Sequence, residues 1–164
     1  IVLDQLNDYS SSIQYYKEVL RIRTLLHGRG VVVADTFLCI GKTYLELDKH
    51  SAAYDNLKES ISIREKMLLD LLPNEKESSF FTFFADTELD NDELTEQYTK
   101  LLECYEAFLP LYKRLHNDTE IVAKYLRQMG ELYFELKDYD SAMKSYQTAL
   151  GAGFTGSAAE LRQK

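Results

Sequence analysis

The sequence predicts an all-α protein built from a row of similar helix pairs. Gly and Pro are scarce, with seven and two residues among 164, so the chain has few of the residues that punctuate short strands. Apolar residues recur at three- and four-residue spacing along most of the chain, which is the period of a helix packed on one side. One motif also returns at a fixed distance, which is typical of a repeat array.

The repeated motif spans residues 37–47 and 126–136. Its two copies share Gly, Tyr, Glu and Leu at positions 89 residues apart: Gly41 and Gly130, Tyr44 and Tyr133, Glu46 and Glu135, Leu47 and Leu136. Two other pairs of segments give shifts of 89 and 41 positions: residues 16–20 with 105–109, and residues 19–23 with 60–64. The period is therefore about 41 residues, with an insertion in the second interval.

Apolar spacing and capping residues place the individual helices. We expect helices near residues 9–27, 33–46, 50–71, 93–116, 119–136 and 139–150. Asp8 and Asp138 are expected to cap helix N-termini, and residues 117–119 are expected to form a turn and a further N-cap.

Proline and glycine are expected to shape three of these helices. Pro73 should stop the helix over 50–71, and Pro110 should bend the helix over 93–116, because its ring removes a backbone hydrogen bond to residue 106. The glycines from Gly151 to Gly156 should end the last helix near residue 150.

These helices are expected to form one array over residues 1–164. Its parts are a partial repeat at 1–27, a repeat at 33–72, a degenerate repeat at 75–116 with an acidic insertion, a repeat at 119–150, and the start of a further helix or cap at 151–164. In the degenerate repeat Thr82 and Ala85 replace the Gly and Tyr, beside a Phe-rich cluster at 80–84. We expect the chain to be a piece of a longer protein.

Both motifs resemble the tetratricopeptide repeat (TPR). The matching positions are Phe37, Ile40, Gly41, Tyr44, Ala53, Leu57 and Ser60, and then Leu126, Met129, Gly130, Tyr133, Ala142, Tyr146 and Ala149. The resemblance implies a right-handed α-α superhelical solenoid of antiparallel helix pairs. Gly41 and Gly130 lack a Cβ, so the helices of a pair can cross closely, and Ala53 and Ala142 serve the same contact. The period near 41 is similar to the long-period repeats of kinesin light chains and nephrocystin-type proteins.

The resemblance implies a protein–protein interaction scaffold or adaptor that binds a peptide or helix of a partner protein in a concave groove. The groove positions of the family fall on Asp35, Leu38, Lys42, Leu45, Lys124, Arg127, Glu131 and Phe134 and, in the degenerate repeat, on Phe83. Lys42, Lys124 and Arg127 are expected to hold acidic groups. The alternatives are an architectural or oligomerisation segment of a large assembly, as a homo-oligomer or a subunit, and the regulatory arm of a larger enzyme.

Charge and residue chemistry disfavour other classes of function. A formal net charge of −8 without a basic run disfavours nucleic acid and anionic membranes as partners. Cys39 and Cys104 lie in apolar helical patterns, so we expect buried thiols in a reducing, cytoplasmic compartment. The histidines lack a metal-ligand spacing and no nucleophile or phosphate-loop motif is present, so we expect no enzyme activity, cofactor or metal site.

Overall fold

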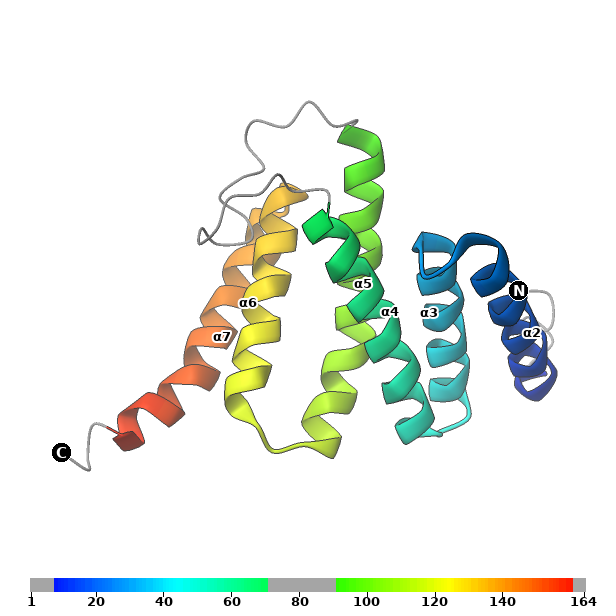
Figure 1. Ribbon diagram of the computed structural model, residues 1–164. Helices are drawn as coiled ribbons and strands as arrows, with labels where there is room; N and C mark the ends of the chain where they lie inside the picture. Colours follow the sequence, from blue (N-terminus) through cyan, green and yellow to red (C-terminus); the bar gives the residue numbers. More distant parts are fainter. Residues whose placement is uncertain (1–7, 71–90, 161–164) are drawn as a thin grey trace. The chain divides into compact units, whose positions relative to one another are not determined.

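The protein is all-α, as predicted. The computed structural model describes residues 8–70 and 91–160, with side chains placed up to residue 152 (Figure 1). Within these ranges the chain is helical apart from short turns, and no strand is present. The chain divides into two compact units, Ile1–Glu77 and Ser78–Lys164, which we describe one at a time.

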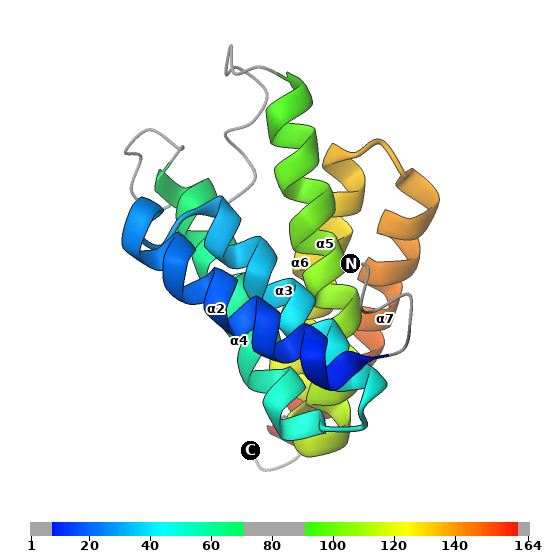
Figure 2. The same cartoon turned by 90° about the vertical axis from the view of Figure 1, so that its right-hand side faces the viewer.

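The first unit contains three consecutive helices, α2 (Tyr9–His27), α3 (Val31–Glu46) and α4 (His50–Asp70). Helix α3 packs against both α2 and α4, and Figure 2 shows α2 in front of α3. All three helices begin and end within two residues of the bounds predicted from the sequence.

Helices α3 and α4 cross closely at Gly41. A Cβ atom at this position would lie 2.8 Å from Cγ of Leu57, whose side chain is fully buried. One helical turn further along α4, Ser60 donates a hydrogen bond of 2.8 Å from its Oγ to the carbonyl oxygen of Ala34. The prediction for Gly41 is confirmed, although the side chain nearest to it is that of Leu57 and not that of Ala53.

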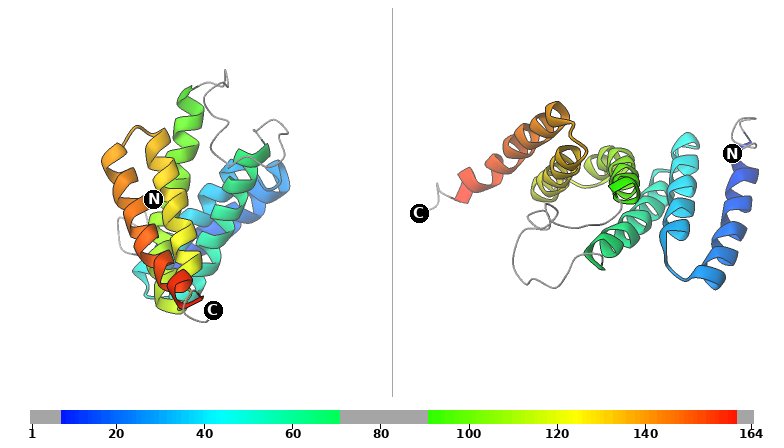
Figure 3. Two further views of the ribbon diagram at one scale, coloured as in Figure 1. Left: turned by 90° about the vertical axis from the view of Figure 1, so that its left-hand side faces the viewer. Right: turned by 90° about the horizontal axis from the view of Figure 1, so that it is seen from above.

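The second unit contains α5 (Asn91–Leu115), α6 (Thr119–Glu135) and α7 (Tyr139–Glu160). Helix α6 packs against α5 and against α7, and the left panel of Figure 3 shows α7 in front of α6. Pro110 lies inside α5, as predicted.

An aromatic cluster joins α5 to α6. The ring of Tyr125 on α6 lies 5.5 Å from that of Tyr105, 5.3 Å from that of Phe108 and 5.9 Å from that of Tyr112, as centroid distances. The three α5 rings are buried, so this cluster is a large part of the apolar core of the unit. Nearby, Tyr133 Oη donates to Glu106 Oε1 at 2.6 Å.

Helices α6 and α7 repeat the close crossing of the first unit. A Cβ atom at Gly130 would lie 2.7 Å from Cε1 of Tyr146, which occupies the position 89 residues after Leu57. The turns after α3 and α6 also match, because Asp48 and Lys137 both have positive φ angles, of 53° and 62°. The two helix pairs therefore share their crossing point and their turn geometry.

The predicted N-caps are confirmed. Asp8 Oδ1 accepts from the backbone N–H of Ser11 at 3.2 Å, and Asp138 Oδ1 accepts from that of Ser141 at 3.2 Å. Asp118 Oδ1 accepts from the N–H groups of Glu120 and Ile121, at 3.1 Å each. Each carboxylate satisfies donors that have no partner within their own helix.

The predicted end of the last helix is wrong. The glycines from Gly151 onward do not stop α7 near residue 150, because the helix continues to Glu160 and no separate helix starts in 151–160. A glycine inside a helix costs about 1 kcal/mol relative to Ala but blocks no backbone hydrogen bond, and this stretch contains no Pro.

Several sequence predictions lie outside the described residues. They concern the stop at Pro73, the degenerate helix with its Phe cluster at 80–84, most of the acidic insertion, and the chain ends at 1–7 and 161–164. The handedness of a superhelix over all the repeats also stays a prediction, since each unit is described by itself.

An internal ion pair fastens α4 to α3. The Arg64 guanidinium, 1% exposed, pairs with the Asp35 carboxylate, which is 39% exposed. A charge this deeply buried is stable in the folded protein when a partner of opposite sign is held beside it. Asp35, which the sequence placed in the binding groove, thus has a structural role in the first unit.

We predict that Gly41→Ala destabilises the protein by about 1 kcal/mol, the middle of a range of about 0–2 kcal/mol. Overpacking costs about 1–3 kcal/mol, and the better helix propensity of Ala returns about 1 kcal/mol. Gly130→Ala should cost less, because the partly exposed Tyr146 ring has room to move. Urea unfolding of both variants measures the difference, and a Gly41→Ala protein more stable than wild type would contradict the close crossing.

We also predict that Asp35→Ala lowers the free energy of unfolding by about 2 kcal/mol. Removing one partner of a fully buried ion pair costs about 3–5 kcal/mol, and the partial exposure of Asp35 reduces that cost. Asp55→Ala, at an exposed site on α4, is the matched control and should change stability by about 0.5 kcal/mol or less. Equal losses in the two variants would show that the Arg64 pair is unimportant.

Candidate protein-binding surfaces

In the first unit, the four predicted groove residues differ in what they present to solvent. Leu38 is 4% exposed and belongs to the core, while Asp35 is occupied by Arg64. Lys42 is exposed and Leu45 is partly exposed. Leu38 therefore offers no side-chain surface for a partner, and the exposed part of Asp35 belongs to a carboxylate already paired with Arg64. The role of Lys42 and Leu45 in binding stays a prediction.

In the second unit, the four predicted residues form one face of α6, which we call the α6 face: Lys124, Arg127, Glu131 and Phe134. Their three- and four-residue spacing places them on one side of the helix. Lys124 is exposed, Arg127 is 65% exposed in its side chain, and Phe134 is 55% exposed. Two cations and an aromatic ring are thus presented together.

Glu131 is the least accessible member of the α6 face. Its side chain is 18% exposed, and its Oε1 lies 3.8 Å from Nε of Arg127. Burial raises the pKa of Glu131, and the positive charge of Arg127 opposes this shift without cancelling it. Burial likewise raises the pKa of Glu135, one turn further along the helix. Both glutamates in turn raise the pKa of Tyr146, after the larger effect of that ring's own burial.

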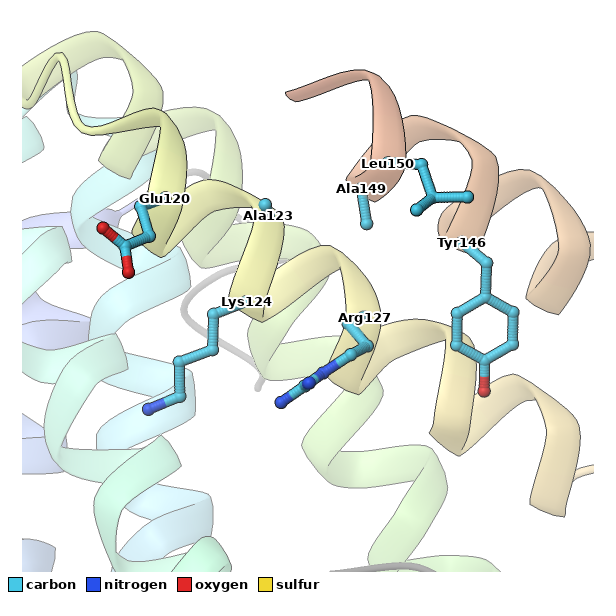
Figure 4. A pocket seen from close by; sticks show the side chains of 7 residues that line it. All are labelled: Glu120, Ala123, Lys124, Arg127, Tyr146, Ala149 and Leu150. Atoms are coloured by element: carbon cyan, nitrogen blue, oxygen red, sulfur yellow. The ribbon is translucent and has the colours of Figure 1, made fainter. Parts of the chain in front are cut away.

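A pocket of about 570 Å³ adjoins the α6 face, between α6 and α7 (Figure 4). We call it the α6–α7 pocket, and its lining consists of Glu120, Ala123, Lys124 and Arg127 from α6 and Tyr146, Ala149 and Leu150 from α7. The side chains of Lys124 and Arg127 extend next to each other along one edge, and the apolar groups come mainly from α7. Its volume is in the range of typical ligand pockets.

The α7 side of this pocket was missed by the sequence analysis. Groove positions were carried over from the first helix of each pair alone, so Ala149 and Leu150 were assigned to no site. A usable signal was present, because Tyr139, Met143, Tyr146 and Leu150 follow one another at four-, three- and four-residue spacing. Three of these four are more than half exposed, so α7 carries an exposed apolar stripe.

Phe83 lies outside the described residues, so its place in a groove stays a prediction. The same holds for a groove shared by Lys42 of the first unit and Arg127 of the second, because the two units are described separately.

The described residues show no group of three or more His, Cys, Asp or Glu side chains arranged to hold a metal ion. Within the same part of the chain, each helix is too short or too polar to cross a lipid bilayer. Cys104 is buried and Cys39 is partly exposed, and both are present as thiols.

The raised pKa of Glu135 predicts a pH-dependent change in stability. The pKa of Glu135 is higher in the folded than in the unfolded state, so this carboxyl does not change the free energy of unfolding at pH values below its unfolded-state pKa. The free energy of unfolding falls as the pH rises through the folded-state pKa. Glu135→Gln should therefore raise the unfolding midpoint at neutral pH and leave it unchanged at about pH 3. Glu96→Gln, at an exposed site on α5, is the control, and an equal gain in both variants at neutral pH would contradict the prediction.

Comparison with known proteins gives a match to one family model and weak likenesses to solved structures. The tetratricopeptide repeat model matches residues 2–24 and 123–152, the second of which covers most of α6 and more than half of α7. No curated protein matches the chain.

Two solved structures illustrate the likeness. The crystal structure of BtubC from P. vanneervenii shares 15% identity at a TM-score of 0.38, over 94% of this chain and 60% of that chain. The crystal structure of MamA shares 16% identity at a TM-score of 0.35, over 95% of each chain. The chain thus spans 60% of the length of BtubC. The family matches, together with two helix pairs that share crossing point and turn, support a tetratricopeptide-repeat family for this chain.

Proposed function

We propose that this chain is a protein–protein interaction scaffold that binds an acidic, partly apolar segment of a partner protein on the α6 face. One observation carries the proposal. Lys124, Arg127 and Phe134 are exposed on the same side of one helix, next to a largely apolar pocket. Cations beside an apolar surface recognise a ligand that carries carboxylates and apolar side chains close together.

The charge of the chain as a whole strengthens this choice of ligand. With a net charge of −8, most of the surface repels an acidic segment, so neighbouring cations form a local site of opposite sign. Lys124 and Arg127 are two such cations on the α6 face, and in the first unit Lys42 is a further exposed lysine. The proposal therefore keeps Lys42 and Leu45 as a second contact region and omits Leu38 and Asp35, which are used inside the fold.

The proposed role is binding and not catalysis, in a cytoplasmic protein. The TPR-type helix pairs support a scaffold, and the thiol state of Cys39 and Cys104 fits a reducing compartment. The period near 41 residues is the reason to propose the long-period subclass similar to kinesin light chains and nephrocystin-type proteins.

An assembly role is a second candidate, favoured by a separate observation on α2. Leu25 and Leu26 are 73% and 71% exposed, and Ile22 on the same helix is 42% exposed. Exposed apolar side chains in such a group mark a surface that another protein covers. Sedimentation equilibrium of the chain, compared with a Leu25→Glu/Leu26→Glu variant, separates this candidate from the first. Dimers that the variant loses would favour an oligomerisation segment.

We predict that Lys124→Glu/Arg127→Glu reduces capture of the natural partner by about tenfold or more, since each 1.4 kcal/mol of lost binding energy is a factor of ten. Quantitative mass spectrometry would compare the proteins retained by the immobilised wild-type chain with those retained by the immobilised variant. In addition, a higher salt concentration should weaken capture by the wild-type chain, because exposed charges are screened.

The matched control is Lys17→Glu/Lys66→Glu, which makes the same change in net charge at exposed positions of α2 and α4. This control should retain the partner as the wild type does. If the two double variants behave alike, the loss comes from net charge and the α6 face is not the binding site.

A further inference from the structure

The α6–α7 pocket has counterparts elsewhere in the chain. Leu150 in the pocket corresponds to Ile61 in α4 at a shift of 89 residues, and Ile61 corresponds to Leu20 in α2 at a shift of 41 residues. The three leucine and isoleucine side chains therefore occupy the same position in the repeat, on α2, α4 and α7.

These equivalent positions differ strongly in exposure. Ile61 is 3% exposed and Leu20 is partly buried, whereas Leu150 is 65% exposed. The contrast extends to the first helix of the pair, where the pocket residue Arg127 corresponds to the buried Leu38. The same repeat position is thus covered at Leu20 and Ile61 and open to solvent at Leu150.

The first unit shows what covers such a position. Leu20 of α2 packs against a buried cluster formed by Val33 and Ala34 of α3 and Ile63 of α4. The cover is thus made of apolar side chains of packed helices, with α3 contributing two of the three. Ridges of this kind fit the groove between two packed helices.

The exposed apolar stripe on α7 is long enough to contact a bound helix over several turns. Met143 and Leu150 lie on it with Tyr146 between them, and Tyr139 begins it. The stripe covers three turns of helix, or about 16 Å. The stripe extends the apolar surface of the pocket along α7, so the two together offer contact to a row of side chains.

The charge at the edge of the pocket selects among helices. Lys124 and Arg127 border the apolar surface on the α6 side, with Glu120 at the start of the helix. A helix that seats an apolar row on α7 must therefore bring its flanking residues close to these cations, and acidic side chains suit that place.

We propose that the α6–α7 pocket and the α7 stripe bind an amphipathic helix of a partner protein, with acidic residues along the edge that faces Lys124 and Arg127. This inference rests on the proposed function and defines the partner segment more closely, as a helix and not an extended peptide. It also adds α7 residues to the binding surface.

The test uses the full chain and three synthetic peptides of about fourteen residues, a length that matches the stripe with a short margin. The first carries Leu at helical three- and four-residue spacing and Glu along one flank. The second has the same composition in an order that gives no apolar face in a helix. The third replaces each Glu of the first by Lys. Fluorescence anisotropy gives the affinity of each labelled peptide.

The first peptide should bind at least about tenfold more tightly than either of the others. Leu150→Asp and Met143→Asp should each weaken its binding by about tenfold, while Thr148→Asp, on the opposite side of α7, should not. All three sites are exposed, so these variants should fold, and circular dichroism at 222 nm checks that each keeps its helix content.

Three results would overturn the inference. If the first and second peptides bind equally and Leu150→Asp has no effect, while Lys124→Glu/Arg127→Glu weakens both, the surface recognises charge alone and the proposed function survives without the helix. If no peptide binds, both proposals lose their support at this surface. If the wild-type chain forms dimers that Leu150→Asp abolishes, the occupant is a second copy of the chain.

Discussion

The structure depends on the close crossing of the helices within each pair, at Gly41 and Gly130. At both positions a side chain of the second helix, Leu57 or Tyr146, occupies the space where a Cβ would lie. This contact fixes the rotation of each helix about its axis, because a glycine offers close approach on one side alone. The crossing thereby decides which residues face the core and which face solvent, and the shared turn at Asp48 and Lys137 holds the second helix at the same register.

A common register lets the two units carry different chemistry on equivalent sites. At the positions of Asp35, Leu38 and Lys42 in the first pair, the second pair has Lys124, Arg127 and Glu131. An acidic residue in the first pair thus corresponds to a basic one in the second, and a buried leucine to an exposed arginine. The exposed lysine of the first pair corresponds to a largely buried glutamate. The two pairs keep the same crossing point and turn geometry, although the first pair uses Asp35 and Leu38 inside its fold and the second exposes Lys124 and Arg127. The binding properties of each unit are thus set by a few side chains.

Sequence reasoning predicted the helices and their caps well, because apolar spacing and N-cap carboxylates act locally. It failed where the outcome depends on competing or distant effects. The end of α7 was misjudged because the cost of glycine in a helix is smaller than its turn preference suggests. Leu38 was placed in a groove because the family position was transferred without knowing what covers it, and burial is a property of the packed neighbours. The spacing of the apolar residues on α7 is the same as that of a buried helix face, so only the exposed fractions of their side chains identify a surface stripe.

In the proposed complex, the two kinds of surface on the second unit would contribute differently to binding. Exposed ion pairs contribute about 0–1 kcal/mol, and Arg127 already has the Glu131 carboxylate 3.8 Å away, so a ligand carboxylate shares this cation with Glu131. Burying one large apolar side chain contributes about 1.5–3 kcal/mol, and Met143 and Leu150 are both more than half exposed before binding. The affinity therefore comes mainly from the apolar stripe. The cations decide the orientation of the bound segment and exclude basic ones, since a lysine held against Lys124 and Arg127 would lose water without gaining a partner.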